Sequence, residues 1–167
     1  ASRIYRISAE YRTDRRAVRA AVTPGPLARV LHDDCPGVER SIRLMSESGS
    51  EHSIVTGPEG IYTSQRFIYG EPGLFDVFSY TLERRASGAS PLDEPGTAVL
   101  CADAAGRYFG SRDPLGKTIA ITTDATRTYT VTGIVKPPPG PSHVTFDIIV
   151  SMSTLQEPAE YLFSDWI

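Results

Sequence analysis

The sequence predicts an α+β fold of two lobes, in which a β-α-β lobe precedes a larger lobe rich in β-strands. The chain has 167 residues, of which 13 are Pro and 14 are Gly, and both residue types disrupt the interior of helices. Near the N-terminus, apolar and polar residues alternate with the period of a strand. A segment rich in Ser, Gly, Glu and Pro, from Ser46 to about Gly60, then separates two differently patterned parts of the chain.

The first lobe is expected to begin with a half-buried strand over residues 4–11. Alternate residues of this segment would share its buried face: Tyr5, Ile7, Ala9 and Tyr11. A short amphipathic helix follows, with Pro26 in its first turn, where the missing N–H group does no harm.

The apolar side of this helix is expected to consist of residues at helical spacing: Leu27, Val30 and Leu31. Pro36-Gly37 ends the pattern, and Val38 to Leu44 predicts a second strand, so that the first 45 or so residues form one β-α-β unit. We expect the helix and the strand over residues 4–11 to bury their apolar sides against each other in one core.

The second lobe is expected to contain short strands separated by turn residues, at residues 61–63, 97–101, 117–122 and 128–135. The last two are expected to form a hairpin connected by residues 124–127. A proline-rich connector, Pro137 to Pro141, should lead to an apolar strand over Phe146 to Met152.

One helix should interrupt these strands, capped by Asp103 and ended by Gly110 in the left-handed conformation. Its buried side is expected to carry Ala104, Ala105, Tyr108 and Phe109.

The charge of the chain argues against nucleic-acid binding, because the formal net charge is −3. Six Arg residues do fall in the first nineteen positions: Arg3, Arg6, Arg12, Arg15, Arg16 and Arg19. Because Glu10 and Asp14 lie among them, we interpret this stretch as a solvated face rather than a basic docking strip. No apolar run approaches the ~20 residues that span a bilayer.

The two cysteines, Cys35 and Cys101, do not form the close pairs that zinc sites use, and we expect buried free thiols, with a single disulfide as the alternative. The contiguous run His32-Asp33-Asp34-Cys35 cannot converge on one ion, because successive helical residues point about 100° apart. His52 and His143 lie in no recognisable ligand or nucleophile pattern. The sequence therefore predicts no catalytic residue, no cofactor and no metal site.

The stretch from Gly110 to Thr118 ends in Gly-Lys-Thr and so looks like a phosphate-binding P-loop. Five residues separate its two glycines where such loops have four, a helix precedes it, and Ile119 to Thr122 is expected to continue as a strand. We therefore expect no ATP binding there and interpret Gly110 and Gly116 as turn residues.

Several ordered motifs resemble those of MacB-like periplasmic core domains of FtsX-type ABC transporter permeases. The aromatic string from Phe67 to Leu82 is typical of that family, as is the order Tyr108-Phe109-Gly110, Asp113-Pro114-Leu115-Gly116-Lys117 and Tyr129-Thr130-Val131-Thr132-Gly133. The opening Arg3 to Ile7 and the stretch Ser142 to Asp147 also fit, so the resemblance covers nearly the whole chain. One departure is Arg84 to Gly88, where the family usually has an acidic turn.

The resemblance implies a Porter-like lobe with an inserted β-rich Sabre-like lobe. Residues 1–46 would form the first part of the Porter-like lobe, 47–144 the Sabre-like lobe, and 145–167 the return strand and the start of the second Porter part. Because the family domain normally continues past Trp166, the resemblance implies an incomplete Porter-like lobe with an exposed apolar edge.

The implied function is that of the extracytoplasmic domain of a permease in the bacterial inner membrane, which relays ATP-driven motion to substrate or partner proteins in efflux or in lipoprotein or peptide export. The implied partners are an ATPase subunit or domain, a second permease copy, and a periplasmic adaptor or lipoprotein. An extracytoplasmic sensor or ligand-binding domain is the alternative. No enzymatic activity is expected.

Overall fold

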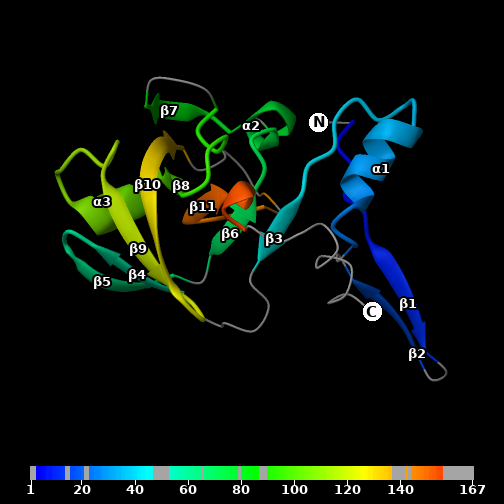
Figure 1. Ribbon diagram of the computed structural model, residues 1–167, viewed down its shortest axis with the longest axis horizontal. Helices are drawn as coiled ribbons and strands as arrows, with labels where there is room; N and C mark the ends of the chain where they lie inside the picture. The colour runs from blue at the N-terminus through cyan, green and yellow to red at the C-terminus, as the bar shows by residue number, and fades with distance from the viewer. Residues whose placement is uncertain are drawn as a thin grey trace. The chain divides into compact units, whose positions relative to one another are not determined.

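The computed structural model describes residues 3–13, 16–20, 23–46, 53–64, 66–78, 80–86, 90–136, 142 and 144–155. The chain divides into two compact units (Figure 1). Unit 1 comprises Ala1–Arg43 with Gln156–Ile167, and unit 2 comprises Leu44–Leu155. None of the described helices has the length and apolar character that a membrane crossing requires.

The described part of unit 1 consists of a hairpin and one helix. Strand β1 (Ala9–Thr13) pairs antiparallel with β2 (Arg16–Ala20), with Tyr11 opposite Val18. Helix α1 (Leu27–Asp34) follows Pro26, as its apolar spacing predicted, and ends where the Cys35 N–H donates to the Leu31 carbonyl at 3.2 Å. The Ser41 hydroxyl donates to the Ala28 carbonyl at 2.6 Å and so ties the segment after the helix back to it.

The described residues of unit 1 do not form the core expected for the first lobe. Tyr5 is 82% exposed, Ile7 is 48% exposed, and no residue of α1 is fully buried. The strand begins at Ala9 and pairs with the next strand of the chain, β2, through the backbone groups that the two strands turn toward each other. The strand expected over residues 38–44 begins only at Leu44, so the predicted β-α-β unit was wrong.

The described residues of unit 2 form one nine-stranded sheet, in which eight strands follow the order β3-β6-β11-β8-β10-β9-β4-β5 and β7 pairs with β10. The bounds are β3 (Leu44–Ser46), β4 (Ser53–Gly57), β5 (Gly60–Ser64), β6 (Phe67–Gly70), β7 (Leu82–Arg85), β8 (Thr97–Cys101), β9 (Thr118–Thr122), β10 (Thr126–Val135) and β11 (Ile148–Ser151). The four strands expected in this part of the sequence are confirmed as β5, β8, β9 and β10, and the β9–β10 hairpin is present.

The polar segment expected to be a loop is partly a strand. Residues 47–52 lie outside the described residues, but Ser53–Gly57 forms β4 between β5 and β9. Buried and exposed residues alternate along β4: Ser53 and Val55 are buried, whereas Ile54 and Thr56 are exposed. This alternation is short, and the sequence was not interpreted as a strand here.

Strand β10 pairs with three other strands, because it is at least twice as long as each of them. One edge pairs in parallel with β8, and the other edge pairs first with β9 and then with β7. The register shifts between Val131 and Gly133, where a Cβ would lie 3.2 Å from a Val99 methyl. The absence of a side chain at Gly133 therefore lets β10 lie close to the Val99 side chain.

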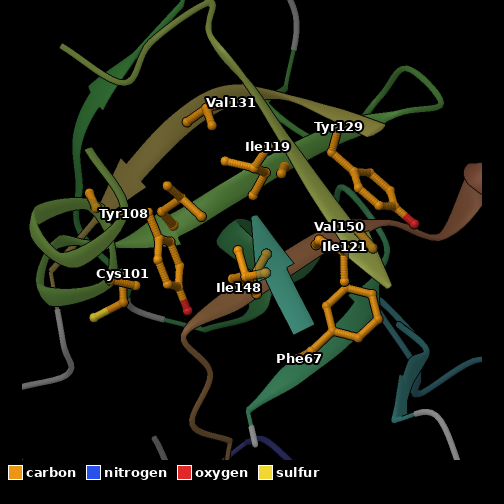
Figure 2. Packing of buried hydrophobic residues seen from close by; sticks show 14 of the residues in the cluster. Phe67, Cys101, Tyr108, Ile119, Ile121, Tyr129, Val131, Ile148 and Val150 are labelled. Atoms are coloured by element: carbon orange, nitrogen blue, oxygen red, sulfur yellow. The ribbon is translucent and has the colours of Figure 1, made fainter. Parts of the chain in front are cut away.

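Both faces of the central strands are covered. Helix α3 (Ala102–Phe109) packs on one face, where Ala104, Ala105, Tyr108 and Phe109 are buried as expected, and Figure 2 shows side chains from α3 and the strands pointing into this cluster. Val99 and Ile149 point to the opposite face, because side chains alternate along a strand. The buried residues outside the α3 cluster also include Leu74 of α2 (Leu74–Val77), Leu92, Val135 and Phe146.

Strand β11, which falls within the strand expected over Phe146 to Met152, lies in the large sheet of unit 2. It pairs in parallel with β6 and antiparallel with β8, and its four residues are all buried. A short 3-10 helix, η1 (Met152–Thr154), follows it. The proline-rich connector at residues 137–141 lies outside the described residues.

Candidate functional site

The Gly-Lys-Thr stretch is a turn that leads into a strand. Gly110 ends α3 with φ 60°, Gly116 has φ 71°, and β9 follows. The Gly116 N–H donates to the Val131 carbonyl at 2.8 Å, and the Val131 N–H donates to the Lys117 carbonyl at 2.8 Å. Because the sheet uses these backbone groups and no helix follows, the stretch lacks the geometry of a phosphate cradle.

An open groove with a volume of about 330 Å³ lies between this turn and α3. Small residues of α3 line it, together with three charged side chains: Ala102, Ala105, Gly106, Arg84, Arg112 and Asp113. Arg84 donates to Asp113 at 2.6 Å, and Arg112 pairs with Glu59 at 3.4 Å. Hydrogen bonds from Arg84 and from the Leu115 N–H hold the pKa of the Asp113 carboxyl below its usual value. Both cations of the groove are thus engaged by carboxylates of unit 2 itself.

A cluster of one carboxylate and two guanidinium groups, which the sequence did not indicate, lies where β6, α3 and β11 meet. The Asp147 side chain, only 10% exposed, pairs with Arg66 and, through Oδ2, with Arg107 at 3.0 Å. The Asp147 N–H donates to the Arg66 carbonyl at 2.8 Å, and its carbonyl accepts from the Cys101 N–H at 3.0 Å. These contacts join three segments far apart in sequence, around residues 66, 101–107 and 147, so no local pattern could have revealed them.

Tyr108 lies beside this cluster in the core. Its ring packs 5.2 Å from the ring of Tyr62, and the Arg107 guanidinium lies 5.7 Å from its centre. Burial disfavours charge on Arg107, but Tyr108 and Asp147 outweigh it and raise the pKa of the guanidinium. The buried Tyr108 hydroxyl has no hydrogen-bond partner among the described residues.

The His32–Cys35 run forms no convergent ligand set in the structure. His32 Nδ1 lies 3.1 Å from Asp33 Oδ1. Cys35 is exposed and Cys101 is buried, and both are free thiols. Burial of Cys35 was expected but does not occur, because this residue follows the last turn of α1, which buries no residue fully. In the described part of the chain, no group of three or more metal-ligating side chains converges. His52 and His143 lie outside that part.

The motifs that carried the resemblance are packing and turn residues. Phe67, Tyr69, Tyr108, Phe109, Tyr129 and Val131 all belong to the buried cluster on the α3 side of the sheet. The aromatic string from Phe67 runs through β6 and α2 into β7, and the Asp113–Lys117 stretch forms the turn before β9. The shared pattern thus encodes the architecture of unit 2.

The fold is found in several solved structures. A domain assigned to a permease protein from Porphyromonas gingivalis is 23% identical with a TM-score of 0.69, and the match covers 91% of this chain and 61% of that one. The periplasmic region of MacB from Actinobacillus actinomycetemcomitans is 21% identical (TM-score 0.57), with 77% of this chain and 54% of that chain covered. The extracellular domain of YknZ, a noncanonic ABC-type transporter from Gram-positive bacteria, is 14% identical (TM-score 0.55), with coverage of 80% and 65%.

The chain therefore spans 54% to 65% of the length of these solved chains. No curated protein matches the sequence significantly. The family described as MacB-like periplasmic core domain matches residues 1–164, which is nearly the whole sequence. The chain belongs to the family of MacB-like periplasmic core domains.

Proposed function

We propose that this chain is the extracytoplasmic domain of an ABC transporter permease subunit and that it relays ATP-driven movement of the membrane helices to proteins outside the membrane. One observation carries the mechanical part of this proposal: the chain enters and leaves unit 2 through β3 and β11, the two strands that flank β6. Leu44, the first residue of the unit, pairs with Gly70, and Ser151, the last residue of β11, pairs with the same Gly70 from the other side.

This arrangement suits a relay because both connections attach to the same end of one stiff sheet. A Cβ at Gly70 would collide with the Ile149 side chain and lie 3.3 Å from a methyl of Leu44, so the junction is closely packed. A displacement applied at the two connections is then carried by hydrogen-bonded strands rather than absorbed locally, because packed interiors have low compressibility.

The finer assignments rest on family membership. We propose that unit 1 corresponds to part of the Porter-like lobe and that unit 2, which extends to Leu155, corresponds to the Sabre-like lobe. The proposed partners are an ATPase subunit or domain, a second permease copy, and an adaptor or lipoprotein in the periplasm. In this proposal ATP is hydrolysed on the ATPase subunit or domain. The present domain therefore needs no catalytic residue of its own. Efflux and lipoprotein or peptide export are the proposed types of transport.

The test removes unit 2 from the full-length permease. Leu44 and Ser151 are two strand spacings apart, about 10 Å, and a six-residue Gly/Ser linker in place of residues 45–150 can bridge that distance. With its ATPase in membrane vesicles, the shortened permease is expected to insert and to support basal ATP hydrolysis but to lose export. The exposed substitution Glu94→Gln is the matched control and should export normally.

Normal export by the shortened permease would overturn the relay. The alternative function, a sensor or ligand-binding domain, has a distinct outcome: export would persist and only its response to an external signal would be lost. The groove beside α3 does not favour this alternative, because its two guanidinium groups are already paired with Asp113 and Glu59.

A further inference from the structure

Strand β5 forms one edge of the large sheet, and in the described part of the chain it pairs only with β4. Its sequence, Gly60-Ile61-Tyr62-Thr63-Ser64, contains no charged residue and no proline. Proteins commonly protect an edge strand with charge, proline, a bulge or shortness. The opposite edge, β3, has only three residues, whereas β5 has five and none of these protections.

The backbone groups available on β5 follow from its hairpin with β4. Gly57 and Gly60 pair across the two-residue turn Pro58-Glu59, and a pair that closes such a turn is hydrogen-bonded. Hydrogen-bonded and non-hydrogen-bonded pairs alternate along an antiparallel ladder. Tyr62 is therefore bonded to β4, whereas the N–H and C=O groups of Ile61 and Thr63 point away from it.

The side chains next to these groups are also uncharged. The outward face of β4 and β5 carries Ile54, Thr56, Ile61 and Thr63. Ile61 is 74% exposed and Ile54 is 46% exposed. An approaching strand would cover apolar and β-branched surface without burying a charge, which is the pattern that favours strand pairing.

We propose that β5 is a docking edge for a second copy of this chain, joined by antiparallel β5–β5 pairing with Tyr62 on the two-fold axis. In this register Ile61 forms a hydrogen-bonded pair with the partner's Thr63, and Thr63 does so with the partner's Ile61. All four outward backbone groups of each strand are then satisfied. A register centred on Ile61 or Thr63 would instead move part of the pairing into the turn or beyond the end of the strand.

The charges that flank β5 favour this antiparallel arrangement over a parallel one. Glu59 precedes the strand, and Arg66 follows it. Antiparallel pairing brings Glu59 near the partner's Arg66 at both ends, whereas parallel pairing would bring like charges together. The side chains of Glu59 and Arg66 are 39% and 51% exposed and already pair with Arg112 and Asp147, so their effect is on direction more than on strength.

The size of the edge sets the strength of the association. A stable interface buries about 800 Å² on each partner, and one edge strand of five residues buries much less. The isolated chain should therefore dimerise weakly, and pairing should become well populated only where a membrane or other tether raises the effective concentration. The inference rests on the edge geometry and does not depend on a transport role.

Cysteine cross-linking of the chain comprising residues 1–167 tests the register. In a Cys35→Ser background, which removes the exposed native thiol, Tyr62→Cys places one cysteine on the two-fold axis. Residues facing each other in a non-hydrogen-bonded pair have Cα atoms about 4.5 Å apart, which suits a disulfide. We expect Tyr62→Cys to give oxidised dimers at high protein concentration, while Ile54→Cys, exposed but on β4, gives at least tenfold less. Equal cross-linking of the two variants, both folded by circular dichroism, would overturn the proposal.

A second pair of variants keeps the test decisive, because Tyr62 packs on Tyr108 and its replacement could impair folding. Thr63→Pro removes an N–H that makes no bond to β4, so the monomer should stay intact. Two hydrogen bonds are lost per dimer, and sedimentation should show self-association weakened roughly tenfold to thirtyfold. Thr63→Val keeps the N–H and should leave it unchanged. A chain that stays monomeric at millimolar concentration, or a dimer insensitive to Thr63→Pro, would refute the pairing. Binding of another protein's strand by a monomeric chain would show that the occupant is wrong.

Discussion

Asp147 ties unit 2 together at the scale of single residues. Its carboxylate is nearly buried and is held by Arg66 and Arg107, while its backbone joins the start of β11 to the Arg66 carbonyl and to the Cys101 N–H. The two guanidinium groups are about half exposed. Loss of the carboxylate charge would therefore release them to solvent, whereas loss of one Arg would leave Asp147 with its second partner.

Asp147→Asn should lower the free energy of unfolding by about 1–3 kcal/mol, because charge-assisted hydrogen bonds in a desolvated site are lost. Arg66→Ala and Arg107→Ala should each cost less. Chemical denaturation monitored by circular dichroism measures this, with the exposed Glu94→Gln as the control. An effect of Asp147→Asn no larger than that of Glu94→Gln would mean that the cluster does not stabilise the fold.

Tyr108 carries a buried polar group whose removal is not expected to destabilise the protein. Its hydroxyl is buried without a described partner, and an unsatisfied hydroxyl costs more than its removal. Tyr108→Phe should therefore leave stability unchanged or raise it by about 1 kcal/mol in thermal and chemical unfolding. A loss of stability would show that the hydroxyl is satisfied after all, with the neighbouring Arg107 as the candidate donor.

Helix α3 shows at the scale of one element how two glycines can have opposite effects. Gly106 lies inside the helix on its exposed side, and a Cβ there would meet no atom within 4 Å. Gly110 ends the helix with φ 60° and ψ −124°, and a Cβ there would lie 3.3 Å from the carboxyl carbon of Glu59. The first position tolerates a side chain, whereas the second requires a backbone conformation that only glycine adopts readily.

Gly106→Ala should raise the free energy of unfolding by about 0.5–1 kcal/mol, because it removes the entropic cost of glycine in a helix. Gly110→Ala should lower it by about 1–3 kcal/mol through backbone strain. Denaturation curves of the two variants serve as matched controls for each other. If both variants shift stability in the same direction, the positive φ of Gly110 is not what ends the helix.

The whole molecule divides unequally between its two units, because almost all of the described buried core belongs to unit 2. Every residue of the buried hydrophobic set lies between Val55 and Val150. The chain enters and leaves this unit on either side of Gly70. Such a unit has its own core and close termini, which are the properties of an independently folding domain.

The fragment 44–155 should therefore fold alone and unfold in one cooperative transition. The fragment 44–146, which lacks β11, should not fold, because β11 lies between β6 and β8 and its removal exposes both. Calorimetry and amide dispersion in NMR spectra measure the difference. Cooperative folding of 44–146, or a noncooperative transition for 44–155, would show that the core is not organised around β11.

The sequence alone determined those features that local pattern encodes. The spacing of Leu27, Val30 and Leu31 predicted α1, and Asp124 between two alternating segments predicted the β9–β10 hairpin. Gly110 and Gly116 were correctly expected at turns, because both have positive φ. The ordered motifs identified the family, since they are packing and turn residues that the fold itself requires.

Only the tertiary structure decided which strands pair, because strand pairing depends on contacts between segments far apart in sequence. The alternation in residues 4–11 indicated a strand face but could not show that Tyr5 would lie outside any core. The burial of Val55 in β4, the place of β11 in the sheet and the convergence of Arg66 and Arg107 on Asp147 all arise from long-range pairing. The free edge of β5 has the same origin, since an edge exists only once the order of the strands is set.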